Sequence, residues 1–110
     1  RKPRYVDASP PRDGGVSWQW RVQQPGRYQL ALWHEADPGN TYAAHAILET
    51  SGRRDEIALL DLTTWGRRWI WLGDVELDRG KAELVLTSSA PGNLSGGRLR
   101  IARWPDAQFE

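Results

Sequence analysis

Two tryptophans and two arginines crowd the eight-residue segment Arg67–Asp74, which reads RRWIWLGD. A flat indole ring can stack on the apolar face of a sugar while nearby polar side chains bond its hydroxyls, as in an apolar site with a few placed polar groups. A planar guanidinium also pairs bidentately with a carboxylate, which favours an acidic glycan. The candidate ligand-binding side chains are Trp33, Trp65, Arg67, Arg68 and Trp71.

The same residues have a structural interpretation that competes with ligand binding. The chain holds seven Trp and only one Phe, and a buried indole N–H needs an acceptor. The rings could cover a second, minor core with the arginines stacked over them. By strand alternation Trp71 shares a face with Trp69, so both are buried or both line one exposed surface. Trp33 is predicted to point away from the main core, and Trp65 to lie in a loop.

The histidines and acids do not form a recognisable catalytic or metal motif. His34 and His45 would approach each other if their strands paired, but no third ligand stands at a zinc spacing. The sequence has no Gly-x-Ser-x-Gly elbow, phosphate loop or HExxH, so we predict a domain without catalytic residues, cofactor or defined metal site. No EF-hand spacing appears, yet a structural calcium ion stays open, with oxygen ligands among Asp37, Asn40, Asp55, Glu56 and Asp61.

The composition is that of one globular domain of 110 residues. Lys and Arg number 15 against 14 Asp and Glu, and the net charge of +1 creates no field to attract nucleic acid or an anionic membrane. No apolar run is long enough for a membrane span, and the absence of cysteine excludes disulfide scaffolds and thiol catalysis. The chain begins without Met, which suggests a single domain over 1–110, with its core at about 4–104, excised from a larger protein.

Apolar residues alternate with period two along most of the chain, the pattern of half-buried strands. Turn signals such as Pro25-Gly26 and Asp37–Asn40 separate the runs. The expected strands are Gly15–Val22, Arg27–His34, Ala43–Thr50, a short one around Ile57–Asp61, Trp69–Leu77 with a bulge at Gly73, Lys81–Thr87 and a closing strand with Leu99 and Ile101. Short strands at this spacing predict an all-β fold, a jelly-roll-like antiparallel β-sandwich of about eight strands. The alternative is a helix over Tyr42–Glu49, because TYAAHAILE is rich in helix formers.

Four short motifs occur in the order of a known pattern. They are Val16–Trp20 (VSWQW), Pro25–Leu30 (PGRYQL), Trp69–Gly73 (WIWLG) and Leu77–Gly80 (LDRG). In their order and spacing, from about Tyr5 to Trp104, the chain resembles the carbohydrate-binding-like domains of the golvesin and xanthan-lyase C-terminal type. Such domains are usually accessory modules of bacterial extracellular enzymes and adhesins. The resemblance implies a secreted or cell-surface module without catalytic activity of its own.

The strand pattern and the resemblance together predict the core. As the tryptophan of a W-x-x-L-G motif, Trp69 is structural if the resemblance holds. The predicted core is Trp18, Trp20, Tyr28, Leu30, Leu32, Trp69, Leu72, Leu84, Leu86 and Ile101. The closing strand lacks the acid that the family often carries there, and Asp61-Leu62 stands where the family often reads Asp-Gln. No ligand or calcium role is therefore carried over from relatives.

Three functions from different classes fit these residues. A carbohydrate-binding module would bind an extracellular polysaccharide, in particular an acidic one, through the Trp and Arg surface. An interaction module would pack the same rings against another domain of its parent protein and have no glycan affinity. A single-stranded nucleic-acid binder would also pair Trp with Arg, but the near-neutral charge disfavours it. We predict the first of these, with no nucleic-acid partner.

Overall fold

Strands make up all the regular structure that the computed structural model describes, which covers residues 3–9, 15–64 and 66–104. Turn residues separate the strands, as the Pro and Gly positions in the sequence require. The strands are β1 (Arg4–Val6), β2 (Val16–Val22), β3 (Gly26–His34), β4 (Ala44–Thr50), β5 (Arg53–Leu60), β6 (Arg68–Leu77), β7 (Gly80–Ser88) and β8 (Leu99–Arg103). Within these ranges there is no helix that could cross a membrane.

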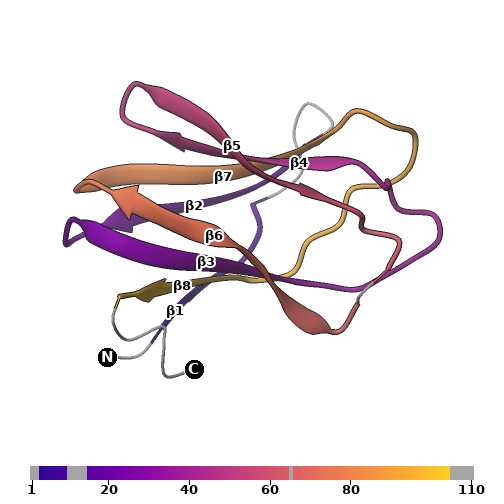
Figure 1. The fold of residues 1–110 in the computed structure, drawn as a ribbon, viewed down its shortest axis with the longest axis horizontal. Coiled ribbons are helices and arrows are strands. Elements are labelled where there is room, and N and C mark those ends of the chain that lie inside the picture. Colours follow the sequence, from indigo (N-terminus) through magenta and orange to yellow (C-terminus); the bar gives the residue numbers. More distant parts are fainter. Residues whose placement is uncertain (1–2, 10–14, 65, 105–110) are drawn as a thin grey trace.

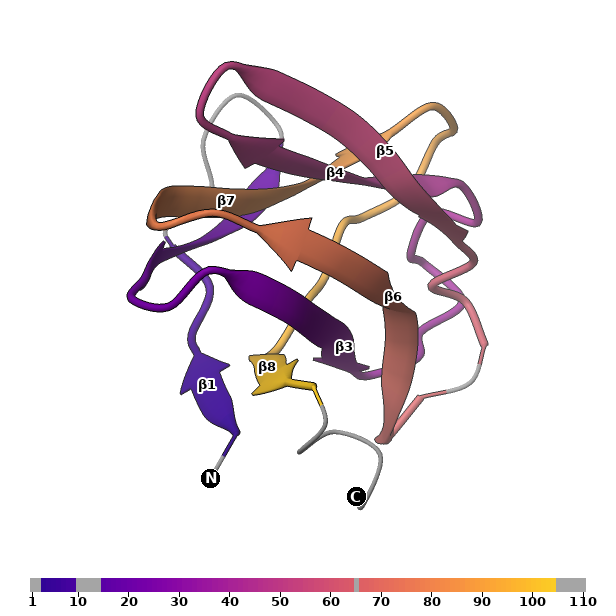
Figure 2. The same ribbon diagram turned by 60° about the vertical axis from the view of Figure 1, so that its left-hand side comes forward.

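The strands form two antiparallel four-stranded sheets that lie face to face (Figure 1). One sheet has the order β1-β8-β3-β6 and the other β2-β7-β4-β5. Figure 2 shows the two layers from the side, with β5 above β6 at one edge and β2 above β1 at the other. The predicted all-β sandwich is confirmed. The helical alternative for Tyr42–Glu49 is wrong, because β4 pairs there with both β5 and β7.

Three details of the strands differ from the expectation. The sequence did not predict β1, whose three residues pair with β8 at the edge of its sheet. The strand expected around Ile57–Asp61 is longer and begins at Arg53. In β6 the bulge falls beside the predicted position: Leu30 pairs with Gly73 and Ala31 with Trp71, which leaves Leu72 as the extra residue.

The core lies between the two sheets and contains most of the residues expected there. Buried positions include Trp18, Trp20, Leu30, Leu32, Leu72, Leu84, Leu86 and Ile101, and Tyr28 packs partly buried against them. Trp69 requires a correction, because it is 39% exposed and belongs to the outer face of its sheet. Ile70 and Leu72 supply the inward side chains of β6, and strand alternation then turns Trp69 outward.

A glycine pair between β7 and β8 packs against the largest core side chain. The Trp18 indole N–H donates to the Gly97 carbonyl at 2.8 Å, which satisfies its buried donor. A Cβ at Gly96 would lie 2.4 Å from Cη2 of the Trp18 ring. Gly97 also donates its own N–H to the Trp33 carbonyl at 2.8 Å. The loop therefore joins the core to the outward-facing part of β3.

We expect Gly96→Ala to destabilise the fold by about 1–3 kcal/mol, because the new methyl group overpacks the Trp18 ring. The measurement is the free energy of unfolding from denaturant titration. In a Trp18→Phe background the outer indole ring is absent, and the same substitution should cost clearly less. An equal cost in both backgrounds would mean that the contact does not limit the packing.

Candidate functional site

The outer face of the β1-β8-β3-β6 sheet carries a group of aromatic side chains. The register places Ala31 opposite Trp71 on one side and Arg100 on the other, and Arg100 opposite Tyr5. Two residues after Ala31 in β3, Trp33 pairs with Trp69 of β6. Tyr5 is 48% exposed and Trp71 62%. We call Tyr5, Trp33, Trp69 and Trp71 the aromatic face.

Trp69 contacts two other rings of the aromatic face. The Trp33 and Trp69 centroids lie 5.5 Å apart with their planes at 69°, an edge-to-face arrangement. The Tyr5 and Trp69 centroids lie 5.7 Å apart at 42°. Such pairs contribute about 0.5–1.5 kcal/mol beyond the area they bury. The contacts hold Trp69 as the centre of the cluster and leave part of its ring open to solvent.

A carboxylate fixes the orientation of Trp33 beside an exposed arginine. Glu35 accepts the Trp33 indole N–H at 3.1 Å through Oε2 and the Arg67 Nε at 3.2 Å through Oε1. Arg67 stands in a left-handed conformation, with φ of 58°, and donates its backbone N–H to the His34 carbonyl at 2.9 Å. Its side chain is 86% exposed. The arrangement places a guanidinium at the end of the aromatic face.

The other predicted binding residues lie apart from this arrangement or outside the described ranges. Arg68 pairs with His34 in the row of β6 that faces inward. It lines a small cavity with Leu59, Asp61 and Trp69 at the β5–β6 edge. Trp65 falls outside the described residues. The structure therefore groups Trp33, Trp71 and Arg67 on one side of the sheet and separates Arg68 from them.

Sequence reasoning did not include Tyr5 or Trp69 in the site. Tyr5 belongs to β1, a strand of three residues that gives no periodic pattern of its own. Trp69 was placed in the core by its motif, although the alternation that grouped it with Trp71 already allowed an exposed pair. The signal that favours the exposed pair is that Ile70 and Leu72 are apolar and take the inner positions of β6.

His45 lies in a hydrogen-bonded group of serine, histidine and glutamate. Its Nε2 is 2.7 Å from the Ser89 Oγ, and its Nδ1 is 2.9 Å from Glu56 Oε1. Nucleophile, base and orienting carboxylate are connected in this order in acyl-transfer enzymes. Those enzymes also need backbone N–H groups free to bind the developing oxyanion.

The backbone around Ser89 does not provide such donors. The Ser89 N–H donates to the Ala43 carbonyl at 3.2 Å, and the Ala90 N–H donates to the Ser88 Oγ at 3.1 Å. Both groups nearest the hydroxyl are thus engaged within the fold. Since His45, Glu56 and Ser89 come from β4, β5 and the end of β7, the hydrogen bonds of this group connect neighbouring strands.

The described residues do not assemble a metal centre. Within residues 3–9, 15–64 and 66–104, no three histidines or acids converge as ligands. His34 is fully buried, with Nε2 at 2.9 Å from the Thr64 carbonyl. Asp61 accepts the Thr63 hydroxyl and backbone N–H, and these hydrogen bonds lower the pKa of its carboxyl below the usual value. Asn40 is buried and donates to the Leu62 carbonyl at 3.1 Å. The hydrogen bonds of Asn40 and Asp61 thus stabilise the loops in which these residues lie.

Comparison with known proteins places the fold but not a family. No protein-family model matches the chain, and no curated protein does. Among solved structures, it is similar to part of a Paenibacillus xanthan lyase, with a TM-score of 0.73 and 18% identity over 84% of this chain. The matched part is 10% of the lyase chain. At this identity the likeness shows the fold alone, and membership of the golvesin and xanthan-lyase family stays a prediction.

We expect Ser89 not to act as a nucleophile. A fluorophosphonate probe should leave it unlabelled, and Ser89→Ala should not change the slow background hydrolysis of p-nitrophenyl acetate. His45→Ala should instead lower the free energy of unfolding by about 0.5–1 kcal/mol, through the lost contacts between β4 and β5. Mass spectrometry detects the label and denaturant titration measures the stability. Labelling of Ser89 that disappears in His45→Ala would contradict this expectation.

Proposed function

We propose that this domain is a non-catalytic module that binds an extracellular polysaccharide through the aromatic face. It would be one part of a larger secreted or cell-surface protein, as the sequence resemblance implies. The likeness to a segment of a xanthan lyase supports an association with polysaccharide-active enzymes in general terms. The small all-β architecture is consistent with a module that has no catalytic activity of its own.

The observation that carries the proposal is the exposure of Tyr5, Trp69 and Trp71 on one side of one sheet. Scattered apolar residues on a surface need no explanation, but a contiguous apolar patch with a polar border indicates an interaction site. Ring contacts already order Tyr5 and Trp69, so stacking a sugar on them costs little additional conformational entropy. A shallow face of this kind gives modest affinity, on the order of micromolar to millimolar.

The border of the aromatic face suits an acidic polysaccharide. The Nε of Arg67 is held by Glu35, while the rest of this highly exposed guanidinium extends from the end of the face. A guanidinium edge pairs with a carboxylate through two parallel hydrogen bonds. Arg67 would thus contact an acidic group on a sugar whose neighbour stacks on the rings.

An interaction module is the second candidate, and a specific observation favours it. Leu59 is 61% exposed and lines a cavity with Trp69 and Ile70 between the edge strands β5 and β6. Another domain of the parent protein could cover this edge together with Trp69 and Trp71. In that case the rings would be buried in the assembled protein and have no glycan affinity.

We expect Trp71→Ala to weaken polysaccharide binding about tenfold, a loss of roughly 1.4 kcal/mol. The stability should change by less than about 1 kcal/mol, because the ring is mostly exposed. Affinity electrophoresis in gels with xanthan, alginate, pectate or neutral dextran measures retention, and thermal melting measures stability. The matched control is Tyr42→Ala, since Tyr42 is equally exposed at 63% but lies between β3 and β4.

Retention that is equal in the wild type, Trp71→Ala and Tyr42→Ala would refute binding through the aromatic face. If the intact domain were retained by none of the gels, the interaction module would replace the carbohydrate-binding proposal. Polysaccharide cleavage by the isolated 110-residue chain would instead overturn its non-catalytic character.

A further inference from the structure

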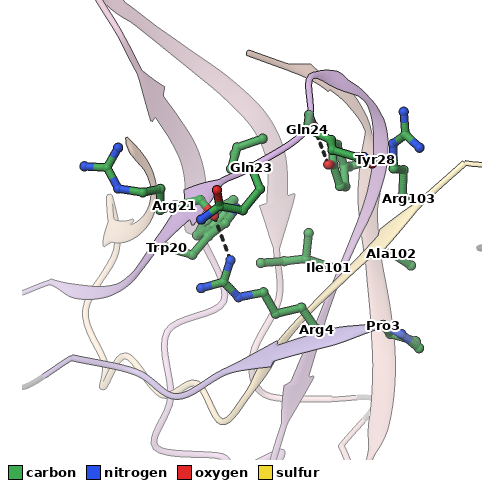
Figure 3. Close-up of a pocket in the computed structure, with 11 residues that line it drawn as sticks. Pro3, Arg4, Trp20, Arg21, Gln23, Gln24, Tyr28, Ile101, Ala102 and Arg103 are labelled. Carbon is green, nitrogen blue, oxygen red and sulfur yellow. Dashed lines mark hydrogen bonds between the residues drawn. The ribbon is translucent and has the colours of Figure 1, made fainter. Parts of the chain in front are cut away.

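A second site lies at the opposite edge of the sandwich, away from β6. A cavity of about 350 Å³ opens between the edge strands β1 and β2, next to the turn that leads into β3. Pockets that hold small molecules begin at roughly this volume, about 300 Å³. Figure 3 shows its lining residues coming from both sheets, with Ile101 and Arg4 below and Trp20 above. The cavity thus lies where the two sheets do not close against each other at this edge.

The walls of this cavity combine apolar and aromatic surface with polar groups at the mouth. Trp20, Val22, Tyr28 and Ile101 form the apolar part, and Gln23, Gln24 and Arg4 lie among the polar lining residues. The Tyr28 hydroxyl donates to the Gln24 carbonyl, which orients the ring. This combination of a few polar groups on an apolar wall is typical of sites for small polar ring compounds.

A buried N–H group of the lining has no acceptor. Trp20 is only 6% exposed, and its indole N–H is buried without a hydrogen-bond partner. The Nε of Arg103 is also buried and unpaired, but its guanidinium points away from Arg4 and Trp20 (Figure 3). About nine in ten or more buried polar groups in proteins are paired, so the unpaired indole donor needs an explanation. A ligand that brings acceptor oxygens would provide it.

Arg4 places a positive charge at this cavity. Its register with Ile101 and Leu30 puts it in the inward row of β1, where it stays exposed because β1 is an edge strand. It crosses between the sheets and donates Nη1 to the Arg21 carbonyl at 2.7 Å. In Figure 3 its guanidinium lies below Trp20, whereas the guanidinium groups of Arg21 and Arg103 point to the sides.

The described lining contains three arginines and no carboxylate, and of the three guanidinium groups that of Arg4 lies below Trp20. The amides of Gln23 and Gln24 can donate or accept, whereas the charged groups of the lining are all cationic donors. A negatively charged group with several acceptor oxygens therefore complements it better than a neutral one.

We infer that this cavity binds a single acidic sugar unit, a uronic acid at a chain end or branch, with its carboxylate toward Arg4 and its ring against Trp20 and Tyr28. A cavity of about 350 Å³ admits one sugar unit, whereas the open aromatic face can follow the interior of a chain. The two sites use different residues, because the aromatic face lies outside the β1-β8-β3-β6 sheet and the cavity lies between the two sheets. This inference therefore does not depend on the proposed function of the aromatic face.

The test is a titration of the ¹⁵N-labelled domain with D-glucuronate, D-glucose and acetate, followed by the indole N–H resonance of Trp20. Trp20→Phe assigns that resonance. Glucuronate should shift it saturably, with a dissociation constant on the order of millimolar. Arg4→Gln should weaken glucuronate binding about tenfold, and Arg4→Lys, which keeps the charge but not the planar fork, should weaken it less. Arg53→Gln, which removes an exposed arginine of β5, is the matched control and should change nothing.

Each other outcome overturns part of the inference. Equal shifts with glucose would contradict the role of charge, and equal shifts with acetate would reduce the cavity to a simple carboxylate site. No saturable shift, or binding that Arg4→Gln leaves intact, would remove the site. Trp71→Ala should bind glucuronate like the wild type, so loss of polysaccharide retention in that variant and loss of glucuronate binding in Arg4→Gln report on separate sites.

Discussion

The contact of Trp18 with the Gly96-Gly97 loop is the constraint on which both the core and the aromatic face depend. Only a residue without Cβ lets the chain pass this close to the indole ring at Gly96. The following residue accepts the Trp18 N–H and donates to the Trp33 carbonyl, and the Arg98 carbonyl accepts the Trp33 N–H at 2.9 Å. A core side chain of one sheet thereby sets the backbone position of a surface tryptophan in the other.

The two candidate sites lie where the sandwich leaves polar groups or aromatic rings without full cover from the rest of the fold. Sheet edges expose backbone groups and leave the interior only partly covered. At the β1–β2 edge the Arg4 side chain bridges to β2 beside a cavity that is lined by Trp20, whose buried indole N–H has no acceptor. On the outer face of the β1-β8-β3-β6 sheet, the Trp69 ring of the edge strand β6 contacts Trp33 and Tyr5. The hydrogen-bonded group at Ser89 has its neighbouring backbone donors engaged.

Much of the fold follows from local pattern. Period-two alternation places Trp18, Trp20, Leu84 and Leu86 inward, because successive side chains of a strand point to opposite faces. The turn residues divide the chain at nearly the right positions. The pattern failed where its units are too short or too irregular: β1 has three residues, and the start of β5 is polar on both faces, so neither contains an alternation to read.

By itself the sequence determined the fold class, most of the core and the outward direction of Trp33, since these depend on alternation within single strands. For Trp71 the same alternation left burial and exposure open. Only the tertiary structure decided which residues meet. Trp69 meets Trp33 through the pairing of β3 with β6, and its contact with Tyr5 joins residues 64 positions apart. The cavity between β1 and β2 likewise needs both sheets to be in place. Local pattern states which way a side chain points, but contacts between distant strands depend on register and sheet order, which no single strand encodes.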